Sequence, residues 1–192
     1  MATPDEIPLQ PGSARQWPAR GRPSAAQGAS AAFIAIAGVI AGTALLGVAA
    51  GFLWAAIAPR ALVEVVGPGS ADIVNPETNA FFLADGWFIV LAVAGGLVSG
   101  TAGYALAVRR NGPAAMAGIL AGGLAAALLA KWIGQQSGAA AFNHSLALGH
   151  VGQLLRDPPM VGGLGPLMFW PLAAGLIAGG MELLSQRPWR RR

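Results

Sequence analysis

Residues 31–58 read AAFIAIAGVIAGTALLGVAAGFLWAAIA and contain no charged side chain. A helix of this length extends about 42 Å, whereas about 20 apolar residues are enough to cross the hydrocarbon of a bilayer. The stretch therefore predicts a membrane-spanning helix that is long enough to tilt or to protrude.

Three further apolar runs follow the first. They cover residues 87–108, residues 114–133 with one charge at Lys131, and residues 164–184 with one charge at Glu182. Both charges lie near the end of a run, where long side chains reach the lipid headgroups. We therefore expect an all-α membrane protein whose domain, residues 31–184, is a four-helix transmembrane bundle.

The composition of the whole chain agrees with this fold class. Of its 192 residues, 55% are hydrophobic and 10% are charged, which is too apolar for an ordinary soluble domain. The basic residues flank the apolar runs and do not form one continuous face, which argues against binding to nucleic acid. The absence of cysteine excludes disulfides, thiolate metal sites and cysteine nucleophiles.

The positions of lysine and arginine predict the orientation. Nine of the twelve would lie on one side, namely Arg15, Arg20, Arg22, Arg109, Arg110, Arg187, Arg190, Arg191 and Arg192. Because cytoplasmic flanks collect basic residues, we expect a plasma-membrane protein with both termini in the cytoplasm. Residues 1–30, rich in proline and glycine, would be a disordered tail, and residues 185–192 a basic tail that attracts anionic lipid. The connections 59–86 and 134–163 would face outward.

Aromatic residues fall near the predicted span ends. Trp54, Trp87 and Trp132 are at the outer ends, whereas Tyr104 and Trp189 are at the inner ends. Amphipathic rings favour the membrane interface, so we expect these side chains to lie there.

Glycine pairs at a spacing of four residues occur in every span. Such pairs let helix backbones approach closely in a bilayer, although a chain rich in alanine and glycine also yields them by chance. The packing candidates are Gly38, Gly42, Gly47, Gly51, Gly96, Gly100, Gly118, Gly122, Gly175 and Gly179.

The first outward connection contains a strand pattern. Apolar residues flank Glu64 in residues 62–66, and Gly-Pro-Gly-Ser follows at residues 67–70. We expect a small β-hairpin whose second strand is residues 71–74. Asn75 followed by Pro76 predicts the start of a helix. Whether that helix continues through Asp85 into the second span stays open.

The second outward connection holds both histidines, His144 and His150, in the apolar stretch 139–155. We expect a short interfacial helix there, ended by the prolines Pro158 and Pro159. A spacing of six puts the histidines on different helix faces, which disfavours a shared metal ion.

The remaining polar residues offer little chemistry. Five outward carboxylates, Glu64, Asp72, Glu77, Asp85 and Asp157, match no calcium-binding loop and predict a solvated acidic surface. Arg60 and Asp85 fall at the outer boundary of the membrane and are candidates for a structural ion pair. We expect no enzyme, because no catalytic constellation is recognisable, and no cofactor or metal.

The segments Pro76-Glu77-Thr78, Ala80-Phe81-Phe82 and Ala84-Asp85-Gly86-Trp87-Phe88 are followed by the Arg109-Arg110 link and a Gly-Ala span. This pattern resembles an uncharacterised actinobacterial family of multi-pass membrane proteins, a domain of unknown function. The resemblance covers roughly residues 31–184, and the Asp-Gly-Trp-Phe segment is its most specific part. It implies a plasma-membrane protein in a cell with an elaborate envelope, and it implies no activity or ligand.

Our leading hypothesis for function is a non-enzymatic scaffold whose outer loops bind an envelope protein or membrane lipid. The structural or partner-contact candidates are Arg60, Glu77, Asp85, Gly86, Trp87, Phe88 and Asp157. The alternative is a transporter, or a transporter subunit, for a small or lipidic solute, with Pro166 and Pro171 kinking the fourth span beside its path. A third hypothesis is an envelope enzyme that uses the outward carboxylates.

Overall fold

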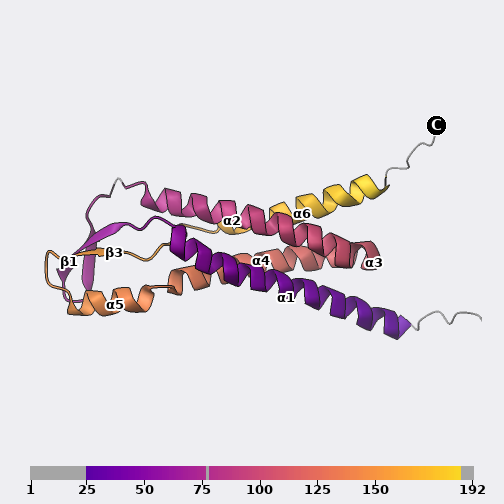
Figure 1. The fold of residues 1–192 in the computed structure, drawn as a ribbon, viewed down its shortest axis with the longest axis horizontal. Coiled ribbons are helices and arrows are strands. Elements are labelled where there is room, and N and C mark those ends of the chain that lie inside the picture. The colour runs from indigo at the N-terminus through magenta and orange to yellow at the C-terminus, as the bar shows by residue number, and fades with distance from the viewer. Residues whose placement is uncertain (1–24, 77, 187–192) are drawn as a thin grey trace, which may run out of the picture.

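The computed structural model describes residues 25–76 and 78–186, which form four long helices and a small sheet (Figure 1). The long helices are α1 (Ala25–Ile57), α2 (Ala80–Gly103), α4 (Pro113–Gln136) and α6 (Gly165–Gln186). They run side by side along the long axis. Each is long and apolar enough to cross a membrane, by length and composition. The expected bundle of four long apolar helices is confirmed.

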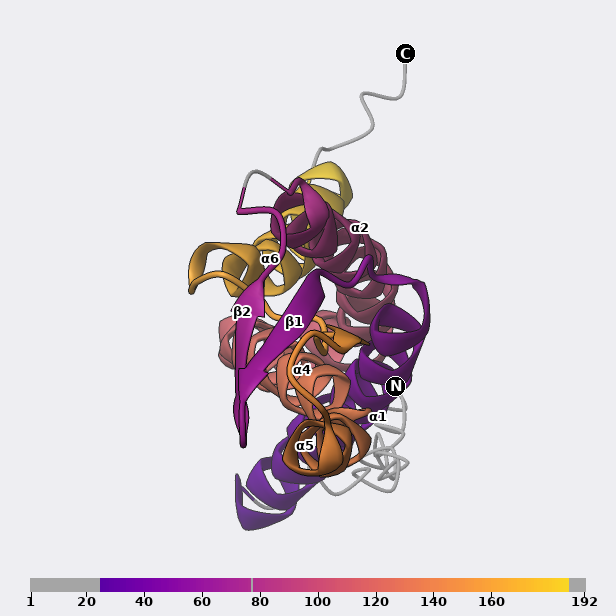
Figure 2. The ribbon, with the colours of Figure 1, turned by 90° about the vertical axis from the view of Figure 1, so that its left-hand side faces the viewer.

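The two ends of the bundle differ (Figures 1 and 2). At one, the sheet end, lie a three-stranded sheet and the short helix α5 (Ala139–Leu148), which runs roughly along the long axis. At the other, the terminal end, α1 begins and α6 ends beside α3 (Arg109–Asn111). The two long connections therefore meet at the sheet end.

The first helix begins earlier than the sequence predicted. α1 starts at Ala25, so residues 25–30 belong to a helix and not to the tail. The rest of that tail, residues 1–24, and the end of the basic tail, residues 187–192, lie outside the described residues.

The helix expected to start at Pro76 starts instead at Ala80, after Asn79. The chain before α2 extends the sheet pairing at Val74, whose amide donates to the Leu62 carbonyl at 3.1 Å. It then forms a turn, in which the Thr78 amide donates to the Asn75 carbonyl at 3.1 Å. α2 then runs without a break through Asp85 and Gly86, which answers the question that the sequence left open.

At the terminal end, the chain changes from α-helical to π-helical geometry. The segment η1 (Tyr104–Val108) continues α2, and α3 follows it directly. Gly112, with φ of 67°, then reverses the chain. Pro113 begins α4, where its missing backbone N–H costs nothing because the first N–H groups of a helix have no partner within the helix. Tyr104 is buried here and is not an exposed interfacial ring.

The hairpin is confirmed. β1 (Leu62–Gly67) pairs antiparallel with β2 (Ser70–Ile73), and Glu64 lies opposite Asp72. Residues 67–70 form the turn between the strands. Its third residue, Gly69, has φ of 70°, a conformation that glycine adopts without strain, and proline is common at the second position of such a turn. The sequence missed a third strand, β3 (Leu154–Arg156), which pairs with the other edge of β1 to give the order β2-β1-β3.

The expected helix over residues 139–155 was too long. α5 ends at Leu148, because Gly149 is extended and Gly152 has φ of 90°. These glycines turn the chain towards β1, where the Val65 amide donates to the Gln153 carbonyl and the Gly152 amide to the Val65 carbonyl, both at 2.9 Å. Strand pairing thus replaces the last part of the helix.

The helices pack mainly in two pairs, α1 with α4 and α2 with α6, and α4 also packs against α6. In the first pair, a Cβ added to Gly47 would lie 2.5 Å from the Ala126 carbonyl oxygen, and one added to Gly51 would lie 2.8 Å from that of Ala130. The two backbones therefore approach too closely for any side chain at either glycine.

In the second pair, the indole of Trp170 on α6 lies against Gly95 on α2, and Gly96 and Gly100 meet the α6 backbone at Trp170 and Ala174. The Trp170 Nε1 group donates to the Ser99 hydroxyl at 3.3 Å, and that hydroxyl donates to the Gly96 carbonyl at 3.3 Å. The Trp170 ring therefore fills the space beside Gly95, while Gly96 and Gly100 let the two backbones approach closely.

The other candidate glycines divide between the helix interfaces and open space. Gly118 faces Ile36, Gly122 faces Ile40, and Gly175 faces Leu120. A Cβ at Gly38, Gly42 or Gly179 would meet no atom within 4 Å.

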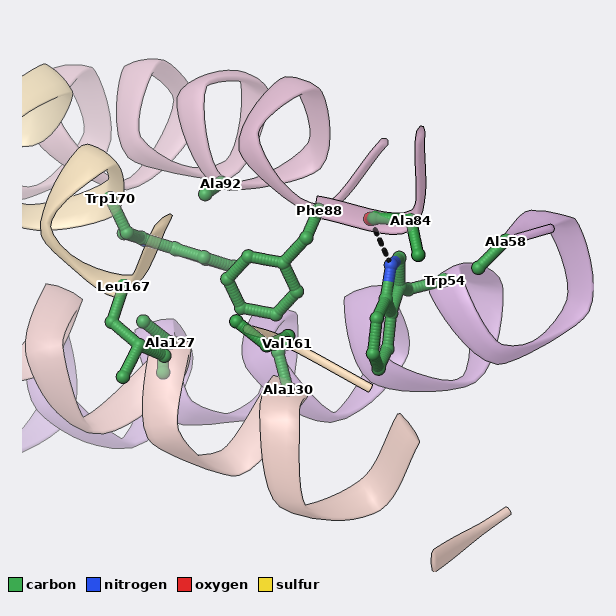
Figure 3. Close-up of a cluster of buried hydrophobic side chains, with 11 residues drawn as sticks. Trp54, Ala58, Ala84, Phe88, Ala92, Ala127, Ala130, Val161, Leu167 and Trp170 are labelled. Atoms are coloured by element: carbon green, nitrogen blue, oxygen red, sulfur yellow. Dashed lines mark hydrogen bonds between the residues drawn. The ribbon is translucent and has the colours of Figure 1, made fainter. Parts of the chain in front are cut away.

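Two buried clusters make up the core. The one nearer the sheet end contains Trp54, Phe88, Leu167 and Trp170 among alanines (Figure 3). Trp54 is fully buried, its ring meets that of Phe88 edge to face at 5.4 Å, and its Nε1 group donates to the Ala84 carbonyl at 2.9 Å. The expected interfacial role of Trp54 is therefore wrong, because this side chain holds α1 against α2.

Candidate docking surface at the sheet end

The sheet has one buried and one exposed face. Along β1, Val63 and Val65 are buried, whereas Leu62 and Glu64 are exposed. Residues directly opposite each other in an antiparallel sheet share a face. The exposed sheet face therefore consists of Leu62, Glu64, Asp72, Leu154 and Arg156.

This face combines apolar and charged groups. Leu62 and Leu154 are 47% and 57% exposed, and Arg156 lies opposite Leu62. Glu64 sits in the middle strand with Asp72 on one side and Leu154 on the other. Like charges directly opposite each other destabilise a sheet, so a partner that brings a positive charge would relieve a repulsion. The face is thus complementary to an apolar surface that carries lysine or arginine.

Both long connections contribute to this surface. β1 and β2 come from the first connection, and β3 comes from the second. The Asp157 amide extends their pairing by donating to the Ala61 carbonyl at 2.9 Å. Because they share one sheet, the two connections form a single unit.

Side chains from the bundle hold this unit in place. The Asp85 carboxylate on α2 accepts a hydrogen bond from the Gly162 amide of the second connection at 3.0 Å. The Arg60 guanidinium donates to the Ala55 carbonyl near the end of α1 at 3.0 Å. Within the described residues, Arg60 and Asp85 form no ion pair with each other. Asp85 instead holds the second connection to α2, and Arg60 satisfies a backbone carbonyl near the end of α1.

A small pocket beneath the second connection contains Asp157. It has a volume of about 280 Å³ and is lined by Gln135, Phe142, Asn143 and Asp157 together with Pro158, Pro159 and Met160. Burial raises the pKa of Asp157 above its ordinary value of 3.8. The charged form is therefore disfavoured in the folded protein.

The other contact candidates are dispersed. Phe88 is buried in the core, Trp87 is 45% exposed, and Gly86 has open space where a Cβ would lie. Glu77 lies outside the described residues. His144 and His150 are exposed, and the described residues contain no group of three or more His, Cys, Asp or Glu that could hold a metal ion.

Sequence reasoning missed Trp170 and Ser99, which connect α6 to α2, and it missed β3. Trp170 lies inside an apolar run, and nothing in the residues around it indicates that it would meet Ser99, which is far away in the sequence. Gly149 and Gly152 were the available signal for β3, because two glycines close together interrupt a helix.

Comparison of the chain with family models, with curated proteins and with solved structures finds no match. The resemblance carried by the Asp-Gly-Trp-Phe segment, residues 85–88, stays a prediction.

Proposed function

We propose that this chain is a multi-pass, non-enzymatic protein of the plasma membrane whose exposed sheet face binds an envelope protein. Both termini would be cytoplasmic, and the sheet end would lie outside the cell. The four long apolar helices support membrane insertion, since they leave many large apolar side chains exposed along their length. The positions of the basic residues support the orientation.

The exposed sheet face is the observation that carries the proposal. A sheet that served only to join helices would gain nothing from exposed leucines in water, yet Leu62 and Leu154 lie exposed beside Glu64 there. The face is also held rigidly, by strand pairing between both connections and by the Asp85 contact. Little ordering entropy would be lost when a partner binds.

The interior of the bundle supports a binding role more than a conducting one. Trp54, Phe88 and Trp170 fill the space between the helices near the sheet end, and closely packed alanines surround them (Figure 3). A transport pathway usually shows an ionisable group or an interrupted helix inside the bundle. The buried polar side chains among the described residues are Thr43 and Ser99, which bond to their own helices.

The first experiment tests membrane insertion and orientation. Reporter fusions after Asn75 and Asn111 should give an exported signal at the first site and a cytoplasmic signal at the second. Release of the protein from membranes by alkaline carbonate would contradict insertion, and reversed reporter signals would contradict the orientation.

The second experiment tests docking. A photo-crosslinking amino acid at Leu154 should trap one discrete protein in intact cells, whereas the same amino acid at the exposed Ala49 of α1 should not trap that protein. Glu64→Lys should abolish the product from Leu154 if charge complementarity contributes to binding. Equal crosslinking from both sites, or an undiminished product with Glu64→Lys, would contradict the proposed surface.

A further inference from the structure

An apolar groove runs along the outside of the bundle between α4 and α6. Its volume is about 630 Å³, and it is lined by Leu120, Ala121 and Leu124 on α4 and by Met168, Leu172 and Leu176 on α6. Contact between Gly123 and Pro171 joins the two helices beside it. Leu172 and Leu176 are 58% and 75% exposed, so the groove opens outward and not into the bundle.

The only lysine of the chain, Lys131, lies on the same helix towards the sheet end. Residues 120, 124 and 131 share one face of α4, because their spacings of four and seven match the helical repeat. Lys131 is about 10 Å from Leu124 along the axis, at the helical rise. It is half-buried, and within the described residues it has no hydrogen bond or ion pair.

Within the described residues, no acidic side chain forms an ion pair with Lys131. Asp157, which lines a pocket together with Gln135 at this end of α4, forms none with it. An exposed tryptophan, Trp132, is the next residue, as is typical of the level of the lipid headgroups. In a bundle inserted as proposed above, the groove would therefore lie at the depth of the acyl chains and the lysine at the depth of the phosphates.

We propose that the groove and Lys131 together bind one anionic glycerophospholipid of the leaflet at the sheet end. An acyl chain would lie between Leu124 and Leu172, and the phosphate would contact the Lys131 ammonium. A second copy packed through residues 31–58 or 87–108 would fill the groove without neutralising the lysine, because these two runs carry no charge. The inference rests on the membrane insertion proposed above, but not on the protein partner.

The test is native mass spectrometry of the full chain in a mild neutral detergent, with equal amounts of dioleoyl phosphatidylglycerol and dioleoyl phosphatidylcholine. We expect one bound lipid, with a preference of about fivefold for phosphatidylglycerol, the effect of one interfacial cation. Lys131→Gln should make the two lipids equal. Arg156→Gln, which removes the same charge from the exposed sheet face, should leave the preference unchanged.

A second pair of variants tests the groove itself. Ala121→Phe should fill it and lower the binding of both lipids, whereas Ala49→Phe on α1 should not. A preference that survives Lys131→Gln, or that falls equally with Arg156→Gln, would overturn the proposal. A dimer that is lost with Ala121→Phe while the lipid preference persists would assign the groove to a second copy. A protein that needs no detergent would instead contradict the membrane proposal.

Discussion

The glycines of the two main helix pairs meet two kinds of neighbour, a helix backbone or a tryptophan ring, and the two kinds of contact respond differently to substitution. Between α1 and α4, Gly47 and Gly51 bring the backbones together at Ala126 and Ala130. Between α2 and α6, Gly96 and Gly100 do the same at Trp170 and Ala174, whereas Gly95 lies against the ring of Trp170. A backbone contact leaves no room for an added atom, whereas a ring contact is emptied when the ring is removed. The same residue type therefore predicts opposite sensitivities, depending on its partner.

The largest expected effect comes from emptying the second interface. Trp170→Ala should lower the free energy of unfolding by about 3–5 kcal/mol, because it leaves a cavity between α2 and α6. The measurement is reversible unfolding in mixed micelles, followed by circular dichroism. Trp132→Ala, at an exposed tryptophan, is the matched control and should change stability little. Equal losses for both variants would mean that the Trp170 contact does not hold the pair together.

Crowding the first interface should have the next largest effect. Gly47→Leu and Gly51→Leu should each cost about 1–3 kcal/mol, because the added atoms collide with the α4 backbone. Gly38→Leu and Gly42→Leu change the same helix where no atom lies within 4 Å, and they should leave the stability unchanged or slightly higher, since leucine is the better helix former. Similar losses in the two pairs of variants would contradict the observed register of α1 on α4.

A smaller effect measures how much the hydrogen bond of Trp170 contributes to stability, apart from the burial of its ring. Ser99→Ala removes the acceptor of the buried indole N–H and should cost about 1 kcal/mol. Thr101→Ala, an exposed hydroxyl on the same helix that bonds only to its own backbone, should cost less. The same micelle unfolding experiment measures both, and a larger loss with Thr101→Ala would show that the indole bond is dispensable.

The smallest effect is a pH dependence at the sheet end. Burial raises the pKa of Asp157 above 3.8, so ionising this carboxyl costs more free energy in the folded protein than in the unfolded chain. The free energy of unfolding is therefore highest below the unfolded pKa and falls as the pH rises through the folded pKa. Asp157→Asn should therefore match the wild type near pH 3 and melt at a higher temperature at pH 7. A lower melting temperature for the variant at pH 7 would contradict this sign.

The candidate site was less predictable than the fold. Apolar length alone located the four helices, and alternation around Glu64 located the hairpin, because both signals are local. β3 was missed since its apolar residues continue the pattern of α5, and only the unpaired edge of β1 draws them into a strand. Trp54 was assigned to the interface because its position at a span end cannot reveal that Ala84 and Phe88 face it.

The amino-acid order by itself determined that four apolar segments form long helices, because a helix satisfies the backbone hydrogen bonds of an apolar run within the run itself. It also predicted the side on which the basic residues gather. The tertiary structure alone decided which glycines are contacted, that Trp170 bonds to Ser99, and that strands from two connections form one sheet. These features depend on pairs of residues far apart in the chain, and a helical or strand period in one segment carries no information about the segment that it meets.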